Sequence, residues 1–366
     1  MRLNSLYMTK LKVGILYGGK SVEHGVSINS ARNIEAYIDK NLYESYCIGI
    51  STRGTWYATP SVSKEIEKGS RLKLHLDGFN PYFENEKGNT IKPDVIFPVL
   101  HGTDGEDGSI QGLIKAMSIP MVGTGVLGSA VAMSKLVAKQ LMQQAGIPVT
   151  DFLFFHHDQL DEINFEVVKE KLGLPFMVKA ANLGSSVGVS KVKNKEEFEA
   201  ALKDSFRYDD CIILEEFVKG REIECAILGN KPPQASLPGE IIISANYDFY
   251  TFDAKYVDGE AVKIEVPAQL DEKTSDTIRE YSIKAYQQLQ CEDFARVDLF
   301  LSDSGKVYVN EINTIPGFTN SSMYPMMWKD RGVSFTDLIS KLIQLGMERY
   351  RNAQRIEKDF QSSLKF

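Results

Sequence analysis

The stretch that decides the fold is Phe294–Ser322, which reads FARVDLFLSDSGKVYVNEINTIPGFTNSS. Two apolar runs, Phe294–Leu301 and Lys306–Ile312, flank the polar tetrapeptide Ser302–Gly305. A short turn that contains glycine between two apolar runs is typical of a β-hairpin. We therefore predict two antiparallel strands that pair with each other here.

Pairing of these strands would bring four polar side chains together. Because side chains alternate between the two faces of a strand, Arg296 and Asp298 share a face, as do Glu311 and Asn313. Oxygen ligands without His or Cys suit magnesium, which also binds phosphate oxygens. A salt-bridged sheet face would explain Arg296 and Asp298 alone. The addition of Glu311 and Asn313 favours a site for a metal and a nucleotide.

The composition is that of a globular protein with room for two or three domains. Of the 366 residues, 43% are hydrophobic and 25% are charged. The net charge of −7 argues against nucleic acid as a main partner. No apolar run approaches the roughly 20 residues that a membrane-spanning helix needs, so we expect no membrane partner. The cysteines show no paired metal spacing and are typical of reduced thiols in a cytosolic protein; they are Cys47, Cys211, Cys225 and Cys291.

Two candidate ligand-binding residues follow predicted strands in the first 130 residues. Glu23 comes after the strand Leu11–Tyr17, and His101 comes directly after the strand Asp94–Leu100. Ligands of open α/β sheets bind at the carboxyl ends of strands. Two plainer interpretations stay open, namely a helix-start carboxylate for Glu23 and a structural histidine with satisfied hydrogen bonds for His101.

The middle of the chain carries residues suited to phosphate binding. The loop Ala180–Gly188, between predicted strands, is rich in small residues whose N–H and hydroxyl groups can fold over phosphates. It lacks the G-K-[ST] of a Walker loop. Lys179 precedes this loop and Lys135 lies near the start of a predicted helix, so each can reach a phosphate or remain solvated.

Two further segments suggest a nucleotide site. An apolar connector, Glu216–Glu222, follows the strand Cys211–Glu215 and could bind an adenine through its backbone, with Glu222 on the ribose. These glutamates could equally be solvated. Asn246–Glu260 is densely aromatic without a period of 2 or 3.6, so we predict a long loop that acts as a lid, or a surface loop anchored by its own rings.

Together, these motifs resemble the D-alanine–D-alanine ligases of the ATP-grasp superfamily, from about Lys12 to Gly346. The matching pieces are Glu23-His24-x-Val26-Ser27, His101-Gly102, Gly105-Glu106-Asp107-Gly108, Gly184–Val189, Glu215…Glu222, Ala254-Lys255-Tyr256, Arg296-Val297-Asp298 and Glu311–Thr314 with Pro316-Gly317. The resemblance implies an α/β and α+β chain with an N-terminal Rossmann-like (pre-ATP-grasp) domain and a two-lobed ATP-grasp fold. The implied domains are 1–130, a central lobe at 131–222, and a C-terminal lobe at 223–366 with the lid at 246–260.

The resemblance also implies the cofactors. Two Mg²⁺ ions, which Mn²⁺ could replace, would be bound by Asp298, Glu311 and Asn313, with Glu311 between them. ATP would be the co-substrate, and a monovalent cation such as K⁺ is a further candidate. The residues implied for ATP are Lys135, Lys179, Ser185, Ser186, Glu215, Glu216, Phe217, Val218, Glu222, Phe249, Lys255, Asn310 and Glu311.

The same resemblance implies the chemistry. ATP would phosphorylate the carboxylate of one D-alanine, and the amine of a second D-alanine would then attack the acylphosphate. Glu23 would bind the first ammonium and form a triad with Ser185 and Tyr256, while Arg296 and the N–H of Gly317 would stabilise the oxyanion. The other implied substrate contacts are His101, Lys255, Ser322, which is also implied in catalysis, and Met323. A homodimer in the cytoplasm that supplies peptidoglycan precursors is implied as well.

Alternative functions stay open at this stage. A sister ligase that makes D-Ala–D-lactate or D-Ala–D-Ser would share these motifs, although Tyr256 and the absence of His from 246–260 favour D-alanine as second substrate. Met323 and Phe252 depart from the family pattern and leave that selectivity open. A non-catalytic ATP-grasp protein would need no oxyanion donor such as Arg296. A dinucleotide-dependent oxidoreductase is disfavoured because G-x-G-x-x-G is absent.

Overall fold

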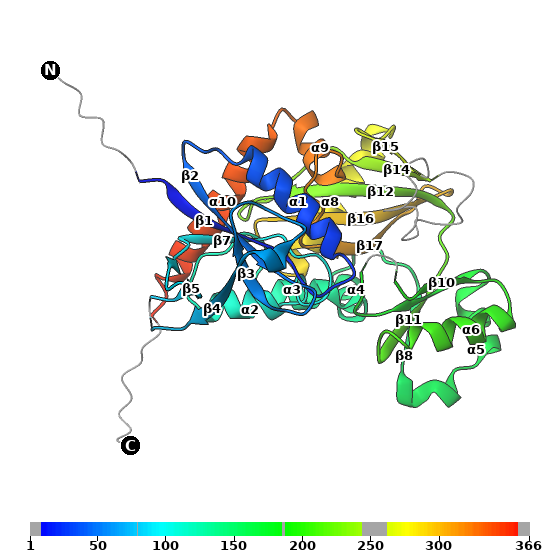
Figure 1. The fold of residues 1–366 in the computed structure, drawn as a ribbon. Coiled ribbons are helices and arrows are strands. Elements are labelled where there is room, and N and C mark those ends of the chain that lie inside the picture. Colours follow the sequence, from blue (N-terminus) through cyan, green and yellow to red (C-terminus); the bar gives the residue numbers. More distant parts are fainter. Residues whose placement is uncertain (1–8, 79, 185–186, 244–261, 358–366) are drawn as a thin grey trace, which may run out of the picture.

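The structure, a computed structural model, describes residues 9–78, 80–184, 187–243 and 262–357. Within these ranges the chain forms three β-sheets in succession, with helices packed around them (Figure 1). This arrangement confirms the predicted fold class, which combines α/β and α+β parts.

The N-terminal sheet has seven strands in the order β6-β5-β4-β3-β2-β1-β7. These strands are β1 (Leu11–Gly18), β2 (Tyr43–Ile50), β3 (Trp56–Thr59), β4 (Ser70–His75), β5 (Tyr82–Asn85), β6 (Thr90–Ile91) and β7 (Val95–Pro98). The apolar β1 pairs in parallel with β2 and β7 and is buried along most of its length. Because β1 and β7 end at the same edge, Glu23 and His101 lie on that edge; α1 (His24–Tyr37) follows β1 and α2 (Ser109–Ala116) follows β7.

The central sheet is antiparallel, with the order β10-β9-β11-β8. Its strands are β8 (Phe152–His156), β9 (Phe176–Ala180), β10 (Val189–Val192) and β11 (Cys211–Glu216), and the helices α5 (Phe165–Leu172) and α6 (Lys195–Ser205) pack on them. Two helices that precede this sheet in the chain, α3 (Val126–Met133) and α4 (Lys135–Gln144), pack against the C-terminal sheet. Ser134 caps α4, since its hydroxyl accepts a hydrogen bond from the N–H of Val137. The rings of Phe165, Phe176 and Phe198 pack together between the helices and the sheet.

The C-terminal sheet has the order β15-β14-β12-β16-β17, with β13 paired to β12. Its elements are β12 (Gly220–Leu228), β13 (Gln234–Ala235), β14 (Gly239–Ile243), β15 (Val262–Glu265), α8 (Glu272–Gln288), β16 (Phe294–Ser302), β17 (Val307–Asn313), α9 (Met323–Asp330) and α10 (Phe335–Ala353). The predicted hairpin is confirmed as β16 and β17. The predicted connector is shorter than expected, because Arg221 and Glu222 pair with β16 as part of β12.

A β-bulge in the hairpin decides which side chains face the same side. Asp298 is paired with Glu311, but the next pair is Leu299 with Val309, so Asn310 is an extra residue. The extra residue reverses the alternation along β17. Val309 therefore lies in the core, while Glu311 lies on the same face as Asp298.

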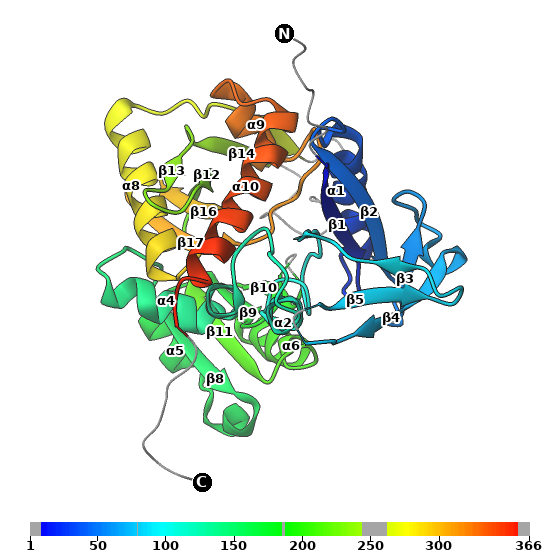
Figure 2. The same ribbon diagram turned by 90° about the vertical axis from the view of Figure 1, so that its left-hand side faces the viewer.

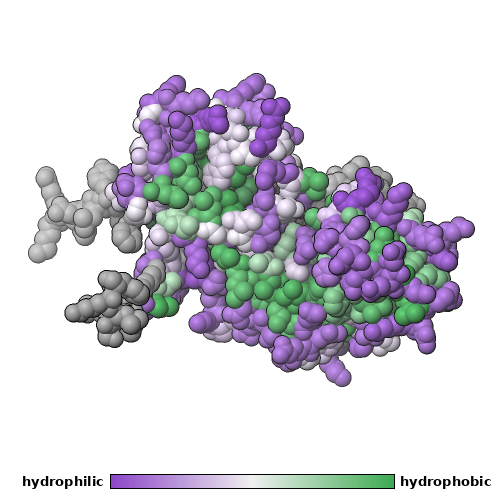
Figure 3. Space-filling view, turned by 90° about the horizontal axis from the view of Figure 1, so that it is seen from below, coloured by the Kyte–Doolittle hydropathy of each residue, from purple (hydrophilic) through white to green (hydrophobic). Residues whose placement is uncertain are grey.

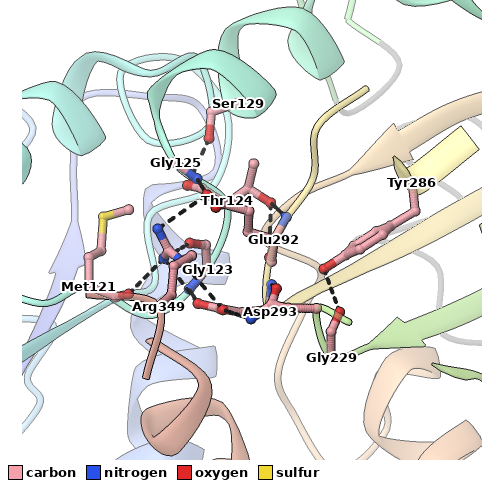
Figure 4. Close-up of polar contacts among 11 residues, drawn as sticks. Met121, Gly123, Thr124, Gly125, Ser129, Gly229, Tyr286, Glu292, Asp293 and Arg349 are labelled. Carbon is pink, nitrogen blue, oxygen red and sulfur yellow. Dashed lines mark hydrogen bonds and ion pairs between the residues drawn. The ribbon is translucent and has the colours of Figure 1, made fainter. Parts of the chain in front are cut away.

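The helix α10 joins the segment around Met121, which borders the N-terminal sheet, to the start of β16. Figure 2 shows α10 running between the N-terminal sheet and the C-terminal sheet. From this helix Arg349 donates hydrogen bonds to the carbonyls of Met121 (2.9 Å) and Gly123 (2.6 Å) and ion-pairs with Asp293 (3.1 Å), as Figure 4 shows. Asp293 is 0% exposed and also accepts a hydrogen bond from the N–H of Gly123. This polar cluster fixes β16 relative to the N-terminal sheet.

The surface and the cysteines of the structure match the expectations drawn from the composition. The face shown in Figure 3 is mainly hydrophilic, with hydrophobic side chains in separate patches. Among the described helices, none combines the length and the apolar character that crossing a bilayer would require. All four cysteines are buried and free, as the sequence predicts.

Replacement of Arg349 by Met should destabilise the protein, because it leaves the buried carboxylate of Asp293 without its cation. Loss of one partner of a buried ion pair costs about 3–5 kcal/mol. Urea unfolding should show this loss, whereas Lys341→Met, on an exposed side of the same helix, should stay close to the unmodified protein. Equal midpoints for the two variants would contradict this role of Arg349.

Candidate active site

Two adjoining cavities contain the predicted site residues. The first cavity, of about 730 Å³, extends from the edge of the N-terminal sheet to the hairpin of the C-terminal sheet. The second cavity, of about 480 Å³, lies between the central and C-terminal sheets. Both cavities are lined by Lys135, Gly184, Glu224 and Glu311. The two volumes therefore meet at the hairpin.

The structure brings the predicted residues together around these cavities. The first cavity is lined by Glu23, His101, Lys135, Arg296, Glu311, Asn313, Gly317, Ser322 and Met323. The second is lined by Lys135, Lys179, Glu215, Glu216, Phe217, Val218, Glu222, Asp298, Asn310 and Glu311. The remaining predictions, Ser185, Ser186, Phe249, Lys255 and Tyr256, lie outside the described residues.

The hairpin offers a set of oxygen ligands suited to magnesium. Asp298 lies directly opposite Glu311, and Arg296 lies opposite Asn313. The described part of the chain contains no group of three or more His, Cys, Asp or Glu side chains placed to hold a metal. A metal at the hairpin would therefore be held by two carboxylates and one amide oxygen, which are hard ligands. The donor set fits Mg²⁺.

Arg296 lies between two carboxylates. Its guanidinium forms a bidentate pair with Asp298, at 2.6 and 2.7 Å, and its Nε lies 3.0 Å from Oε2 of Glu224. Glu224 is 3% exposed and lies on β12 opposite Asp298. Glu224 was not predicted, although its position two residues after Glu222 places both on one face of a strand.

Two lysines approach the place where the cavities meet. Lys135 Nζ donates to the carbonyl of Leu183 and lies 3.5 Å from Oε2 of Glu311. Lys179 Nζ lies 2.7 Å from Oε2 of Glu215. Burial opposes the charge of Lys179, but the Glu215 carboxylate outweighs it and raises the pKa of this ammonium. Both cations lie where they could reach phosphate oxygens.

His101 is fully occupied by bonds to the protein. Burial lowers its pKa and favours the neutral imidazole. Nδ1 lies 2.8 Å from the carbonyl of Ile315 and must donate to it, so Nε2 accepts from the hydroxyl of Ser30 at 3.0 Å. That hydroxyl also accepts from the N–H of Phe318. His101 lines the cavity, but its polar atoms hold the segment that carries Gly317.

Glu106 supports the same segment, and the sequence analysis gave it no role. Its carboxylate accepts hydrogen bonds from the N–H groups of Gly102 (2.7 Å) and Ile315 (3.1 Å). Burial and the neighbouring Glu23 carboxylate raise the pKa of Glu106 to about 8. Gly102 has a φ of +76°, and a Cβ there would lie 2.7 Å from Oε2 of Glu23, so this turn requires glycine.

Comparison with known proteins agrees with this geometry. The model of the N-terminus of D-ala D-ala ligases matches residues 12–124, and that of the C-terminus matches residues 141–344. The D-alanine--D-alanine ligase of Oceanobacillus iheyensis is 44% identical over 361 residues, covering 95% of this chain and 98% of that protein. D-alanine--D-alanine ligase A of Escherichia coli is 43% identical over 356 residues, covering 94% and 97%.

Solved structures of similar proteins have the same fold. The D-alanine-D-alanine ligase from Coxiella burnetii superposes with a TM-score of 0.83 at 36% identity, covering 94% of this chain and 96% of that one. The VanG D-Ala:D-Ser ligase from Enterococcus faecalis superposes with a TM-score of 0.82 at 34% identity, covering 92% and 100%. Sequence and fold agree over nearly the whole length: the chain belongs to the D-alanine–D-alanine ligase family.

Proposed function

We propose that this chain joins two molecules of D-alanine into D-alanyl-D-alanine for peptidoglycan precursors, with conversion of ATP to ADP and phosphate. The observation that carries this proposal is the meeting of two cavities at one hairpin. The second cavity suits a nucleotide and the first suits amino acids, and Lys135 and Glu311 line both. A phosphoryl group could thus pass from one cavity to a carboxylate in the other.

ATP would occupy the second cavity. Its adenine would lie against the connector that includes Phe217 and Val218, and its ribose would bind Glu222. The buried Glu215 lines this cavity beside the connector, and its carboxylate forms ion pairs with Lys179 and Lys139. The phosphates would extend toward Lys179 and Lys135.

The hairpin would hold the metal ions beside the phosphates. Asp298, Glu311 and Asn313 would bind two Mg²⁺ ions, which supply positive charge that neutralises the phosphate oxygens. Glu311 lies 3.5 Å from Lys135, so the protein adds its own cation at the same place. A carboxylate nucleophile would otherwise be repelled by the polyanionic ATP.

The two amino acids would occupy the first cavity. Glu23 would bind the ammonium of the first D-alanine. A carboxylate oxygen of this D-alanine would attack the γ-phosphorus of ATP, and ADP would leave. The second D-alanine, held by its carboxylate near Ser322, attacks the acyl carbon with its amine, loses a proton and displaces phosphate. Arg296 and the N–H of Gly317 would stabilise the oxyanion, a contribution on the order of 10²–10³ in rate.

D-serine as the second substrate is the other candidate, because the VanG D-Ala:D-Ser ligase has a similar structure. Met323 lines the first cavity next to Ser322 and packs on Gly239, where a Cβ would lie 2.6 Å from the Met323 sulfur. We expect this apolar wall to favour the methyl group of D-alanine, as an apolar surface leaves a serine hydroxyl without a hydrogen bond.

The family suggests further cofactors and an assembly. We expect Mn²⁺ to replace Mg²⁺, and we retain K⁺ as a candidate cation and the homodimer as the candidate assembly. We place the reaction in the cytoplasm, which supplies ATP and would keep the four free thiols reduced. The net charge of −7 again disfavours nucleic acid as a partner.

Phosphate release should depend on D-alanine. Purified protein with ATP and Mg²⁺ should release phosphate only when D-alanine is added, and mass spectrometry should then find D-alanyl-D-alanine. With equal D-alanine and D-serine, the D-Ala–D-Ala product should dominate. Phosphate release that ignores D-alanine would refute the ligase proposal, and a dominant mixed dipeptide would favour the D-serine alternative.

Arg296→Lys should reduce kcat about 10²-fold, because lysine keeps the charge but loses the planar fork that Asp298 and Glu224 hold. The KM for ATP should change less than kcat, since the guanidinium lines the first cavity and reaches the second only through Asp298. Steady-state kinetics check this split. The control Arg279→Lys, in a pair with Asp276 on α8, should behave like the unmodified protein, and an equal kcat for both variants would contradict the role of Arg296.

A further inference from the structure

A buried lysine outside both cavities contacts Glu215, a residue that lines the second cavity. Lys139 lies on α4, one turn after Lys135, and is only 1% exposed. Its Nζ donates a hydrogen bond to Oγ1 of Thr150 at 2.8 Å and lies 3.3 Å from Oε1 of Glu215. It is not among the residues that line either cavity. A lysine buried this deeply requires an anionic partner, and Glu215 is that partner.

The Glu215 carboxylate is shared between two ammonium groups. Glu215 is 1% exposed; Oε1 faces Lys139 and Oε2 faces Lys179, at 2.7 Å. Burial alone would raise the pKa of this carboxyl, but the two lysines outweigh it and lower the pKa to about 2. Burial lowers the pKa of the Lys139 ammonium, and the Glu215 carboxylate opposes that loss of charge. With both ammonium groups protonated, two cations share this one carboxylate in a region that is shielded from water. Of the two cations, Lys179 is the one that lines the second cavity.

We propose that Lys139 is a positioning residue for the phosphates of the nucleotide. By pairing with the far oxygen of Glu215, it prevents that carboxylate from fully neutralising Lys179, so that Lys179 keeps charge with which to attract phosphate. This inference rests on the proposed binding of ATP in the second cavity. Without Lys139, Glu215 and Lys179 would form a closed neutral pair, and the field at the phosphates would weaken.

The proposal separates ligands that carry phosphate from ligands that do not. Adenosine would contact the connector and Glu222 without approaching Lys179, whereas ADP would place its phosphates beside it. In Lys139→Met, ADP should bind about tenfold more weakly, while adenosine should bind as it does to the unmodified protein. Lys139→Arg, which keeps the charge, should restore most of the ADP affinity.

Calorimetric titration with ADP and with adenosine tests this inference. Two controls separate the contact between Lys139 and Glu215 from general effects of charge and packing. Lys169→Met tests charge, because it removes an exposed cation from α5. Met142→Leu tests packing, because it alters the buried face of α4. Both should bind ADP normally. If Lys139→Met does not fold, Lys139→Gln removes the charge but keeps a donor for Thr150.

The outcomes distinguish this inference from the proposed function. If Lys139→Met, or Lys139→Gln in its place, binds ADP as tightly as the unmodified protein, the inference is overturned. It is also overturned if the variant binds ADP and adenosine equally more weakly, because that result would indicate a merely structural role. Failure of the unmodified protein to bind ADP at all would instead refute the proposed nucleotide site. Selective loss of ADP affinity, restored by arginine, would support the inference.

Discussion

The pairing of β16 with β17 is the constraint on which the rest of the structure depends. One register places Asp298 opposite Glu311 and Arg296 opposite Asn313, and the extra residue Asn310 allows the core to keep its apolar side chains. A shift of one residue would turn these polar side chains into the core, where unpaired charges are costly. The hydrophobic packing of the hairpin therefore also fixes the geometry of the site.

Contacts from distant parts of the chain hold this hairpin in place. Arg349 and Asp293 fix the start of β16 to the N-terminal domain. At the other end, His101 and Glu106 bond to the backbone of Ile315, just after β17. The first cavity is thus assembled from segments about 200 residues apart, as the hydrogen bond between His101 and Ile315 spans 214 positions. A disturbance of either anchor would alter catalysis without touching a substrate.

Local patterns in the sequence were sufficient for the hairpin and for several residues that line the cavities, and the family resemblance predicted others. Alternation along a strand predicts the shared face of Arg296 and Asp298, and strand ends predict the position of Glu23. The bulge at Asn310 was not predicted, and neither were the roles of Glu106, Glu224 and Lys139, because these roles depend on partners from other elements. One signal for Lys139 was its position three residues before Met142, which places it on the buried face of α4. The roles of the predicted lid residues stay predictions.

The proposed reaction requires divalent cations and a nucleotide to meet at the oxygen ligands of the hairpin. The most direct measurement is the affinity for ADP with and without Mg²⁺, in the unmodified protein and in Glu311→Gln. We expect Mg²⁺ to strengthen ADP binding to the unmodified protein about tenfold or more, and to have little effect on the variant, which lacks the carboxylate that lines both cavities. Equal strengthening by Mg²⁺ in both proteins would contradict the account.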